Sequence, residues 1–451
     1  MNSPQASAAQ PPLIVPRPEH SISRSQISEH ALKVLYRLRG AGYQAYLVGG
    51  GVRDLLLGRE PKDFDVATNA RPEEVKALFR NCRLIGRRFR LAHVRFGDEI
   101  VEVATFRALH APEREAEDTD EDELDHARDE SGRILRDNVY GTLEEDAWRR
   151  DFTVNALYYN IDDFSVVDYT GGLADLRAGV LRLIGDPDKR FREDPVRMLR
   201  AVRFAVKLGF RIHPETEKRI FELGPLLRDI PPARLFEETI KLFMMGYGVQ
   251  AFEMLRHYGL FGHLFPMTQE CLEREEQGFP VMFLVRALES TDRRVAENKP
   301  VTPVFLFATL LWEPVRVRAQ ALMAQGIAEI AALRLAGEEI VERQQQHVAL
   351  PRRFAVPMRE IFELQPRFNM RQGKRAARLL AHPRFRAAYD FLVLRAQAGE
   401  VDGELAEWWT NVQSVDAEAR EKLLRAMPEP GRRRRRRRGR RGTGAPPAPA
   451  E

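Results

Sequence analysis

The stretch LVGGGVRDLLLGREPKDFDVATN, residues 47–69, decides the fold of the N-terminal part of this chain. Gly49, Gly50 and Gly51 stand between an apolar run and Arg53. Glycine has no Cβ, so such a turn lets the backbone approach a ligand and exposes N–H groups that can bind phosphate. Because the turn follows a predicted strand and precedes a helical turn, it predicts a phosphate-binding site with Arg53 beside it. A glycine-rich turn with a surface arginine is the alternative.

Two carboxylates, Asp63 and Asp65, follow the glycine turn on the predicted strand DFDVAT. Residues i and i+2 point to the same face of a strand, so these carboxylates are expected to converge. Mg²⁺ would relieve their repulsion, since it prefers oxygen ligands and shares them with substrate phosphates. A third carboxylate would complete a two-metal site, and Glu102 and Asp151 are both candidates for it. An isolated D-x-D pair more often marks an exposed strand or turn, but the upstream glycine turn favours the metal site.

Length and composition predict a cytoplasmic protein of several domains. The chain has 451 residues, too many for one core, and no apolar run long enough to predict a membrane span. The N-terminus is polar and proline-rich, unlike a secretory signal. The two cysteines, Cys82 and Cys271, argue against a disulfide framework and indicate the cytoplasm. The net charge of +5 hides a C-terminal tail with nine arginines and one acidic residue, so the rest of the chain is slightly acidic.

Periodicity predicts an α+β unit followed by helices. Helices are expected over 21–43 and 72–80, and a hairpin over 92–106 with its turn at Gly97–Asp98. The segment 113–130 is almost entirely charged and mostly acidic, which indicates a solvated insertion. From residue 186 onward nearly every segment has helical periodicity, so the C-terminal half is expected to be all-α.

Together these motifs resemble the active-site signature of the class II tRNA nucleotidyltransferase and bacterial poly(A) polymerase family. LVGGGVRDLLLG…DFDV is followed in order by RRDFTVNALYYN (149–160) and EDPVRMLRAVRFAVKLGF (193–210). The similarity runs from about residue 30 to 260 and continues more weakly to about 400. It implies an α+β fold, a polymerase-beta-like nucleotidyltransferase palm followed by all-α domains. It also implies an enzyme that extends RNA 3′ ends without a template.

The resemblance implies roles for individual residues. Asp63 and Asp65 match the metal-binding carboxylates, and Asp151 matches the acidic residue that is catalytic in the family's arginine–arginine–aspartate motif. Asp194 and Arg197 match the pair that contacts the incoming base. The full set of implied nucleotide-binding residues is Gly49, Gly50, Arg53, Arg149, Arg150, Asp194, Arg197 and Arg200.

The residues of 193–207 support the base-reading role independently. Pro195 stands where a helix starts, and Asp194 and Arg197 lie three apart, so they are expected to share a face. A carboxylate offers acceptors and a guanidinium offers donors to a base edge. The helix also carries a basic stripe of Arg197, Arg200, Arg203 and Lys207. Without the family, a Glu193–Arg197 pair on a solvated charged face is the favoured alternative.

Two basic segments favour a poly(A) polymerase over a tRNA enzyme. The stretch LIGRRFRLAHV (84–94) resembles poly(A) polymerases, whereas tRNA enzymes usually have a glycine–histidine–glycine–threonine-like sequence there. An arginine-rich tail suits an enzyme that attracts many RNAs through their phosphates. A solubilising or localisation role is the alternative for the tail. The expected RNA-binding residues are Arg87, Arg88, Arg90, Arg432, Arg433, Arg434, Arg435, Arg436, Arg437 and Arg438.

The sequence therefore predicts a cytoplasmic, monomeric polynucleotide adenylyltransferase that uses ATP and promotes RNA turnover. Two Mg²⁺ ions are the expected cofactors, with Glu102 as the tentative third metal-binding carboxylate, and Mn²⁺ is expected to substitute. Expected partners are the 3′ ends of mRNA fragments, regulatory RNA and defective stable RNA, and the RNA-degradation machinery. The alternatives are a CCA-adding tRNA nucleotidyltransferase and a non-catalytic RNA-binding protein.

Five regions are expected along the chain. They are a disordered leader (1–25), a nucleotidyltransferase catalytic domain (26–185) with the acidic insertion 113–130, a helical nucleotide- and RNA-binding domain (186–260), a helical RNA-binding domain (261–428) and a disordered arginine-rich tail (429–451).

Overall fold

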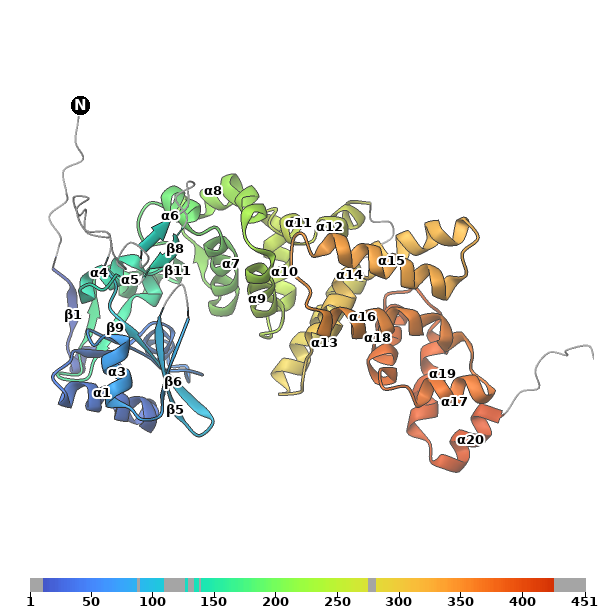
Figure 1. Ribbon diagram of the computed structural model, residues 1–451, viewed down its shortest axis with the longest axis horizontal. Helices are drawn as coiled ribbons and strands as arrows, with labels where there is room; N and C mark the ends of the chain where they lie inside the picture. The colour runs from blue at the N-terminus through green and yellow to red at the C-terminus, as the bar shows by residue number, and fades with distance from the viewer. Residues whose placement is uncertain are drawn as a thin grey trace, which may run out of the picture.

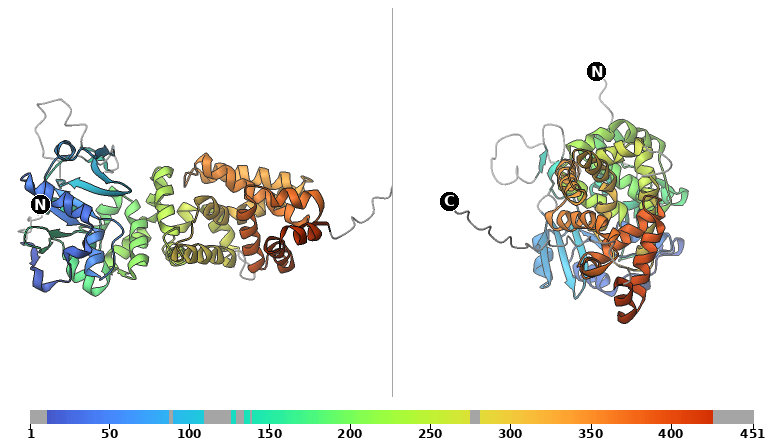
Figure 2. Two further views of the ribbon diagram at one scale, coloured as in Figure 1. Left: turned by 90° about the horizontal axis from the view of Figure 1, so that it is seen from below. Right: turned by 90° about the vertical axis from the view of Figure 1, so that its right-hand side faces the viewer.

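A computed structural model describes residues 11–86, 90–108, 126–128, 134–137, 139–274 and 281–425. The molecule is elongated, with a mixed sheet and its helices at the N-terminal end and a long run of helices extending away from it (Figures 1 and 2). The predicted α+β palm followed by helices is confirmed.

The palm is built on one eight-stranded sheet. Its order is β1-β10-β9-β2-β3-β6-β5-β4. Strands β3 and β6 pair parallel, whereas the other neighbours pair antiparallel. The strands are β1 (Leu13–Val15), β2 (Ala45–Val48), β3 (Asp65–Thr68), β4 (Cys82–Ile85), β5 (Leu91–Phe96), β6 (Glu99–Thr105), β9 (Leu157–Asn160) and β10 (Val166–Asp168).

Local sequence signals explain where the β5–β6 hairpin turns and where helix α1 begins. The hairpin β5–β6 turns at Gly97, whose φ of 60° suits glycine, as predicted. Helix α1 (Glu29–Gly40) starts after Ser28, whose side chain accepts a hydrogen bond from the Ala31 N–H. Its buried side chains pack on the sheet. The remaining palm helices are α2 (Gly50–Leu56), α3 (Pro72–Leu78), α4 (Leu143–Arg149) and α5 (Gly172–Ala178).

Several predicted boundaries are wrong. The predicted disordered leader reaches too far, because β1 pairs with β10 at the sheet edge and two 3-10 helices (Arg17–Glu19 and Arg24–Gln26) follow it. The helix predicted over 21–43 is only α1. The residues before α1 form a turn instead, because the Ser23 side chain accepts a hydrogen bond from the Ser25 N–H.

Other corrections concern strands. Asp63 is not on a strand, since β3 begins at Asp65. In the segment predicted to be a patternless insertion, 126–128 form β7 (His126–Arg128), which pairs with β8 (Ile134–Asp137). Residues 113–125 and 129–130 lie outside the described residues. The helical half also contains β12 (Arg211–Ile212), which pairs parallel with β11 (Val180–Leu181) across the expected boundary at 185.

The helical region continues from the palm along the length of the molecule (Figure 1). Within the described part of the chain, no helix is long and apolar enough to cross a membrane. The helices are α6 (Pro187–Glu193), α7 (Val196–Leu208), α8 (Pro214–Leu223), α9 (Pro232–Phe243), α10 (Gly248–His257), α11 (Phe261–Leu264), α12 (Pro266–Glu273), α13 (Val281–Ala296), α14 (Pro303–Ala324), α15 (Glu329–Gln344), α16 (Arg352–Leu364), α17 (Gly373–Leu380), α18 (Phe385–Gln397), α19 (Gly403–Ser414) and α20 (Ala417–Arg425), with 3-10 helices η5 (Gly224–Asp229) and η6 (Gln365–Asn369).

Gly172 provides a test of palm packing. A Cβ at Gly172 would lie 2.2 Å from the Thr153 carbonyl oxygen, whereas a Cβ at Gly40 would meet nothing within 4 Å. We expect Gly172→Ala to lower the free energy of unfolding by about 2 kcal/mol or more through overpacking. The matched variant Gly40→Ala should leave it unchanged or slightly higher. Thermal unfolding followed by circular dichroism measures both; equal midpoints for the two variants would contradict this packing.

Candidate active site

The glycine turn faces two arginines, one buried (Arg53) and one half-buried (Arg150). Gly49 has φ 74° and ψ −134°, a conformation that a side chain would strain, and it precedes α2. A Cβ on Gly49 would lie 3.5 Å from the Arg150 Nη1 atom, and one on Gly50 would lie 3.4 Å from the Arg53 Nη2 atom. The structure therefore brings Gly49, Gly50, Arg53 and Arg150 together; the sequence placed Arg53 beside the turn, and the resemblance implied Arg150 as a further nucleotide-binding residue. Backbone N–H groups and two guanidiniums at one turn suit an anion with several phosphates.

Arg53 is held in place by neighbours on two elements. It is 2% exposed, so it is not the surface arginine of the alternative interpretation. Its Nε and Nη2 atoms donate to Asp54 Oδ1 at 2.8 and 2.7 Å, and its Nη1 atom donates to Asn155 Oδ1 at 2.5 Å. These bonds fix the plane of the guanidinium, so little conformational entropy remains to be lost when an anion binds.

Arg150 is fixed in the same manner by Asp146 and Tyr158. Its Nε and Nη2 atoms donate to Asp146 Oδ2 at 3.2 and 3.1 Å, and Nε lies 2.9 Å from the Tyr158 hydroxyl. That hydroxyl donates to Asp146 Oδ2 at 2.7 Å. Burial opposes the charge of Arg150, but these two partners raise its pKa above the ordinary value. Arg150 therefore carries a permanent positive charge beside the turn.

The strand register places Glu102 beside Asp65. In the parallel β3–β6 pair, Asp65 and Glu102 are register partners. Burial, and then the negative charges of Glu102 and Asp63, raise the pKa of Asp65 to about 6, although Arg150 and His93 oppose this. Glu102 also lies 3.2 Å from His93 Nε2. Asp63, Asp65 and Glu102 thus share one electrostatic environment that a cation would stabilise.

These carboxylates fit a divalent metal by their chemistry. Mg²⁺ takes oxygen ligands, and all three side chains supply them. As the side chains lie, no three carboxylate, imidazole or thiol groups within the described ranges are gathered closely enough to hold one metal ion. The carboxylate set, and the repulsion that raises the pKa of Asp65, are the features that suit a cation here.

Asp151 has other partners. Its Oδ2 atom accepts hydrogen bonds from Arg200 Nε and Nη2 at 2.8 and 2.5 Å. Its Oδ1 atom accepts from the Phe152 N–H at 2.8 Å and from Asn155 Nδ2 at 3.3 Å. Burial would raise the pKa of Asp151, but Arg200 outweighs it, and the pKa falls to about 2. With both oxygens engaged, Asp151 fits a metal less well than Glu102, so the geometry favours Glu102 as the third carboxylate.

Asp194 and Arg197 both lie at the α6–α7 junction, but each binds a side chain from outside the pair. Asp194 is not on α7; it ends α6, and its Oδ2 atom accepts from Arg234 Nη2 at 2.6 Å. Arg197 is 8% exposed and donates through Nη1 to Glu193 Oε2 at 3.2 Å. The alternative Glu193–Arg197 pair is therefore present, but it is buried rather than solvated.

The predicted basic stripe on α7 is neutralised by acidic side chains, so the alternative of a solvated charged face is wrong. Arg200 pairs with Asp151, Arg203 Nε lies 3.3 Å from Glu238 Oε2, and Lys207 Nζ lies 3.8 Å from Asp54 Oδ2. Periodicity alone could not show these acids, since they come from other segments of the chain.

The other arginines that the sequence assigned to nucleotide or RNA binding are only partly described by the structure. The carbonyl oxygens of Arg149 and Arg150 each accept from Arg190 Nη2 at 2.6 Å, which ties the arginine–arginine–aspartate segment to α6. Arg90 pairs with Glu73 at 2.9 Å on the surface. Arg87, Arg88 and Arg432 to Arg438 lie outside the described residues.

Sequence reasoning missed the residues that hold the site together. Asp54, Asp146, Asn155 and Tyr158 position the two arginines, and Arg234 holds Asp194. Asp54 and Asn155 lie inside the quoted motifs, so the sequence offered a reason to consider them as site residues. Arg234 lies 40 residues from Asp194 and offered none.

Comparison with known proteins identifies the family. Three family models match: one described as the poly A polymerase head domain (45–182), one as a probable RNA and SrmB-binding site of polymerase A (209–272) and one as the polymerase A arginine-rich C-terminus (325–442). Poly(A) polymerase I of Salmonella typhimurium is 51% identical over 437 residues, which are 95% of this chain and 92% of that protein. The chain belongs to the poly(A) polymerase I family. The relative from Haemophilus influenzae is 47% identical, over 91% of this chain and 90% of its own length.

CCA-adding enzymes share the fold but are more distant than poly(A) polymerase I. The enzyme of Geobacillus stearothermophilus is 39% identical over 237 residues, which are 52% of this chain and 54% of that protein. A crystal structure of the Bacillus stearothermophilus CCA-adding enzyme in complex with CTP aligns with a TM-score of 0.55 at 27% identity, over 84% of this chain and 80% of that one. The sequence similarity to poly(A) polymerase I therefore extends over nearly the whole chain, whereas that to the CCA-adding enzyme covers about half of it.

The low pKa of Asp151 gives a pH-dependent prediction. A carboxylate whose folded pKa lies below its ordinary value of 3.8 stabilises the fold above that pH and loses the effect as the pH falls toward 2. We expect Asp151→Asn to lower the free energy of unfolding by about 2 kcal/mol at pH 7, and by less at pH 3.5. Asp162→Asn, which breaks an exposed pair with Arg39, is the control and should change little. Urea unfolding at both pH values measures this, and a pH-independent loss would refute it.

Proposed function

We propose that this chain is a polynucleotide adenylyltransferase that adds adenosines from ATP to RNA 3′ ends without a template. The observation that carries the proposal is the glycine turn with two fixed guanidiniums, Arg53 and Arg150, beside the carboxylates Asp63, Asp65 and Glu102. Identity of about half over nearly the whole chain to proteins named poly(A) polymerase I supports adenosine as the nucleotide added.

In the proposed reaction, the RNA 3′-hydroxyl attacks the α-phosphate of ATP. A bond forms between that oxygen and phosphorus, the bond from phosphorus to the bridging oxygen of the β-phosphate breaks, and pyrophosphate leaves. The glycine turn, Arg53 and Arg150 bind the triphosphate and stabilise the charge on the leaving group. Asp63, Asp65 and Glu102 would hold the divalent ions. Mg²⁺, when bound, supplies activation of the hydroxyl and neutralisation of phosphate charge, and Mn²⁺ can substitute.

Base selection is assigned to the α6–α7 junction. Asp194 would accept from the base and Arg197 would donate to it, and their partners Arg234 and Glu193 hold both groups in one orientation. A rigid pair suits an enzyme that accepts one base at every step. Arg200 would act through Asp151, which it binds, and so connects α7 to Asn155 and Arg53.

We place this activity in bacterial RNA turnover, in the cytoplasm and in a monomeric enzyme. The substrates would be 3′ ends of mRNA fragments, regulatory RNA and defective stable RNA, with the RNA-degradation machinery as the protein partner. We assign RNA attraction to Arg87, Arg88 and Arg90 and to the arginine-rich tail, because contiguous arginines bind phosphates independently of sequence. The regions 26–185, 186–260 and 261–428 remain our proposed division of the chain.

Products on defined RNAs test the activity. Given a short single-stranded RNA and ATP, the enzyme should add many adenosines, and CTP should support little extension. The same reaction on tRNA that lacks its CCA end, resolved on a sequencing gel, decides between the two family activities. Addition of two cytidines and one adenosine with no longer product would show a CCA-adding enzyme. Binding of RNA with no extension at all would show a non-catalytic protein.

Substitution of the carboxylates tests the metal assignment. We expect Asp65→Asn to lower turnover by more than about 10³-fold, because it removes a charged oxygen ligand. Glu102→Gln should raise the Mg²⁺ concentration that gives half-maximal rate. Asp162→Asn, on the palm surface, is the control. Filter binding of RNA should be unchanged in all three variants. An unaltered Mg²⁺ dependence of Glu102→Gln would remove Glu102 from the site.

A further inference from the structure

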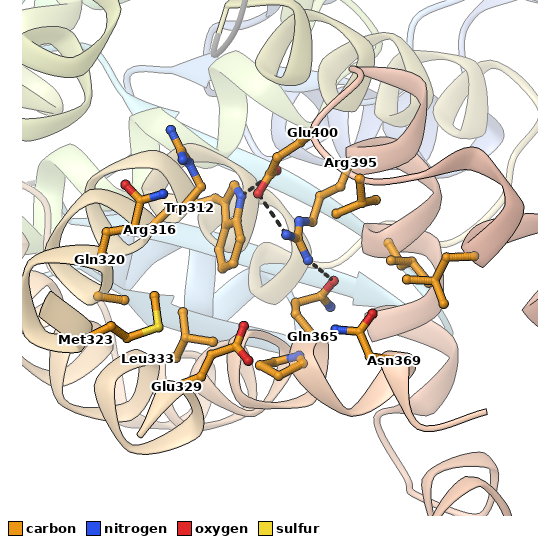
Figure 3. A pocket seen from close by; sticks show the side chains of 15 residues that line it. Trp312, Arg316, Gln320, Met323, Glu329, Leu333, Gln365, Asn369, Arg395 and Glu400 are labelled. Atoms are coloured by element: carbon orange, nitrogen blue, oxygen red, sulfur yellow. Dashed lines mark hydrogen bonds and ion pairs between the residues drawn. The ribbon is translucent and has the colours of Figure 1, made fainter. Parts of the chain in front are cut away.

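A cavity of about 270 Å³ opens among the C-terminal helices (Figure 3), at the end of the molecule away from the palm (Figure 1). It lies between α14, α15, the 3-10 helix η6, α18, α19 and the loop that joins α18 to α19. Its walls are mixed: Met323, Leu333, Pro366, Leu392 and Leu405 supply apolar surface, and charged and amide side chains supply the rest. This size and mixed lining suit one planar heterocyclic ring, which has apolar faces and a polar edge.

One side of the cavity is a rigid polar network. Trp312 Nε1 donates to Glu400 Oε2 at 2.9 Å, and Glu400 Oε1 accepts from Arg395 Nη2 at 2.8 Å. Arg395 also donates to Gln365 Oε1 at 3.0 Å, and its guanidinium stacks on the Trp312 ring at 4.7 Å (Figure 3). These contacts hold the four side chains in one arrangement, so the network shapes one wall of the cavity.

The rim offers hydrogen-bonding groups that no other described residue uses. Gln320, Glu329 and Asn369 line the cavity and are exposed. Their side chains make no hydrogen bond or ion pair with the rest of the described chain. Amide side chains pair with the N6 and N7 atoms of adenine, and a carboxylate accepts from an exocyclic amino group. The two amides therefore favour adenine, whereas the carboxylate suits any base that carries an exocyclic amino group, adenine included.

A basic surface begins directly beside this rim. Residues 365–389 contain seven arginines and lysines and no acidic residue. Arg384 and Arg386 are neutralised by Glu360 and Asp390. The other exposed cations follow Asn369 onto α17 and have no ion-pair partner within the described ranges; they are Arg371, Lys374, Arg375 and Arg378. We call these four the α17 cations. Positive charge next to a base-sized cavity is typical of single-stranded nucleic-acid sites.

We propose that this cavity and the α17 cations form a second RNA site, in which the cavity holds one unstacked adenine and the cations bind the adjoining phosphates. The proposal rests on the proposed function, because that activity produces a single-stranded adenosine tail. Such a site would retain the growing product while its 3′ end occupies the palm.

Binding of labelled RNA by the full-length protein tests the cavity. The probes are fluorescein-labelled A15 and C15, and the variant is Gln320→Ala/Asn369→Ala, which changes two exposed side chains. We expect the variant to bind A15 about fivefold to tenfold more weakly, with little change for C15. Gln325→Ala, at the end of the same helix α14 but outside the cavity, is the matched control and should bind both probes as the wild type does.

The α17 cations require a separate measurement. We expect Lys374→Gln/Arg375→Gln/Arg378→Gln to weaken A15 and C15 equally and to reduce the dependence of affinity on salt. Arg384→Gln/Arg386→Gln removes two cations that are already paired, so its salt dependence should stay closer to that of the wild type. Equal salt dependence in both variants would refute the role of α17.

Extension of a trinucleotide primer, which occupies the palm alone, separates this proposal from the proposed function. The cavity variant should extend the trinucleotide at the wild-type rate. If wild-type protein extends the primer but the cavity variant keeps the full preference for A15, the second site is wrong and the proposed function stands. If wild-type protein extends no primer, the proposed function fails instead.

Discussion

The arrangement of the site depends on the ion pair between the half-buried guanidinium of Arg150 and the buried carboxylate of Asp146. The guanidinium lies against the glycine turn, opposes the rise in the pKa of Asp65, and is fixed by Asp146 and Tyr158. The backbone carbonyl of Arg150 accepts from Arg190 of α6, so the same residue connects the sheet to the helical region. The network therefore fixes the triphosphate side and the base side of the site relative to each other.

Local signals in the sequence were sufficient for the parts of the site that lie close together in the chain. The glycine turn, α2 and the β5–β6 hairpin were predictable because turn chemistry and alternation act over a few residues. Asp63 and Asp65 were found from their spacing, although β3 begins only at Asp65. Glu102 remained one of two candidates, because only the parallel pairing of β3 with β6 shows that it is the register partner of Asp65.

The rest of the site depends on contacts between distant segments, which periodicity does not encode. The acids that neutralise the α7 arginines, Asp151 and Glu238, approach them only in the folded chain. Likewise, β1 is an isolated apolar triplet in a polar, proline-rich segment, and its partner β10 lies some 150 residues further on. In both cases contacts between distant segments decide the structure, and the local sequence does not contain them.

The distribution of charge pairs separates two tasks within one chain. Around the palm and α7, arginines are buried or half-buried and are paired with acids, which fixes their geometry and suits one small, highly charged ligand. On α17 the cations are exposed and lack acidic partners within the described ranges, which suits a polymer whose phosphates can shift by one position. Paired cations orient a substrate, whereas unpaired ones attract it. An enzyme that repeats one addition on a lengthening RNA needs both: a fixed nucleotide site, and a tolerant surface that holds the product as it moves.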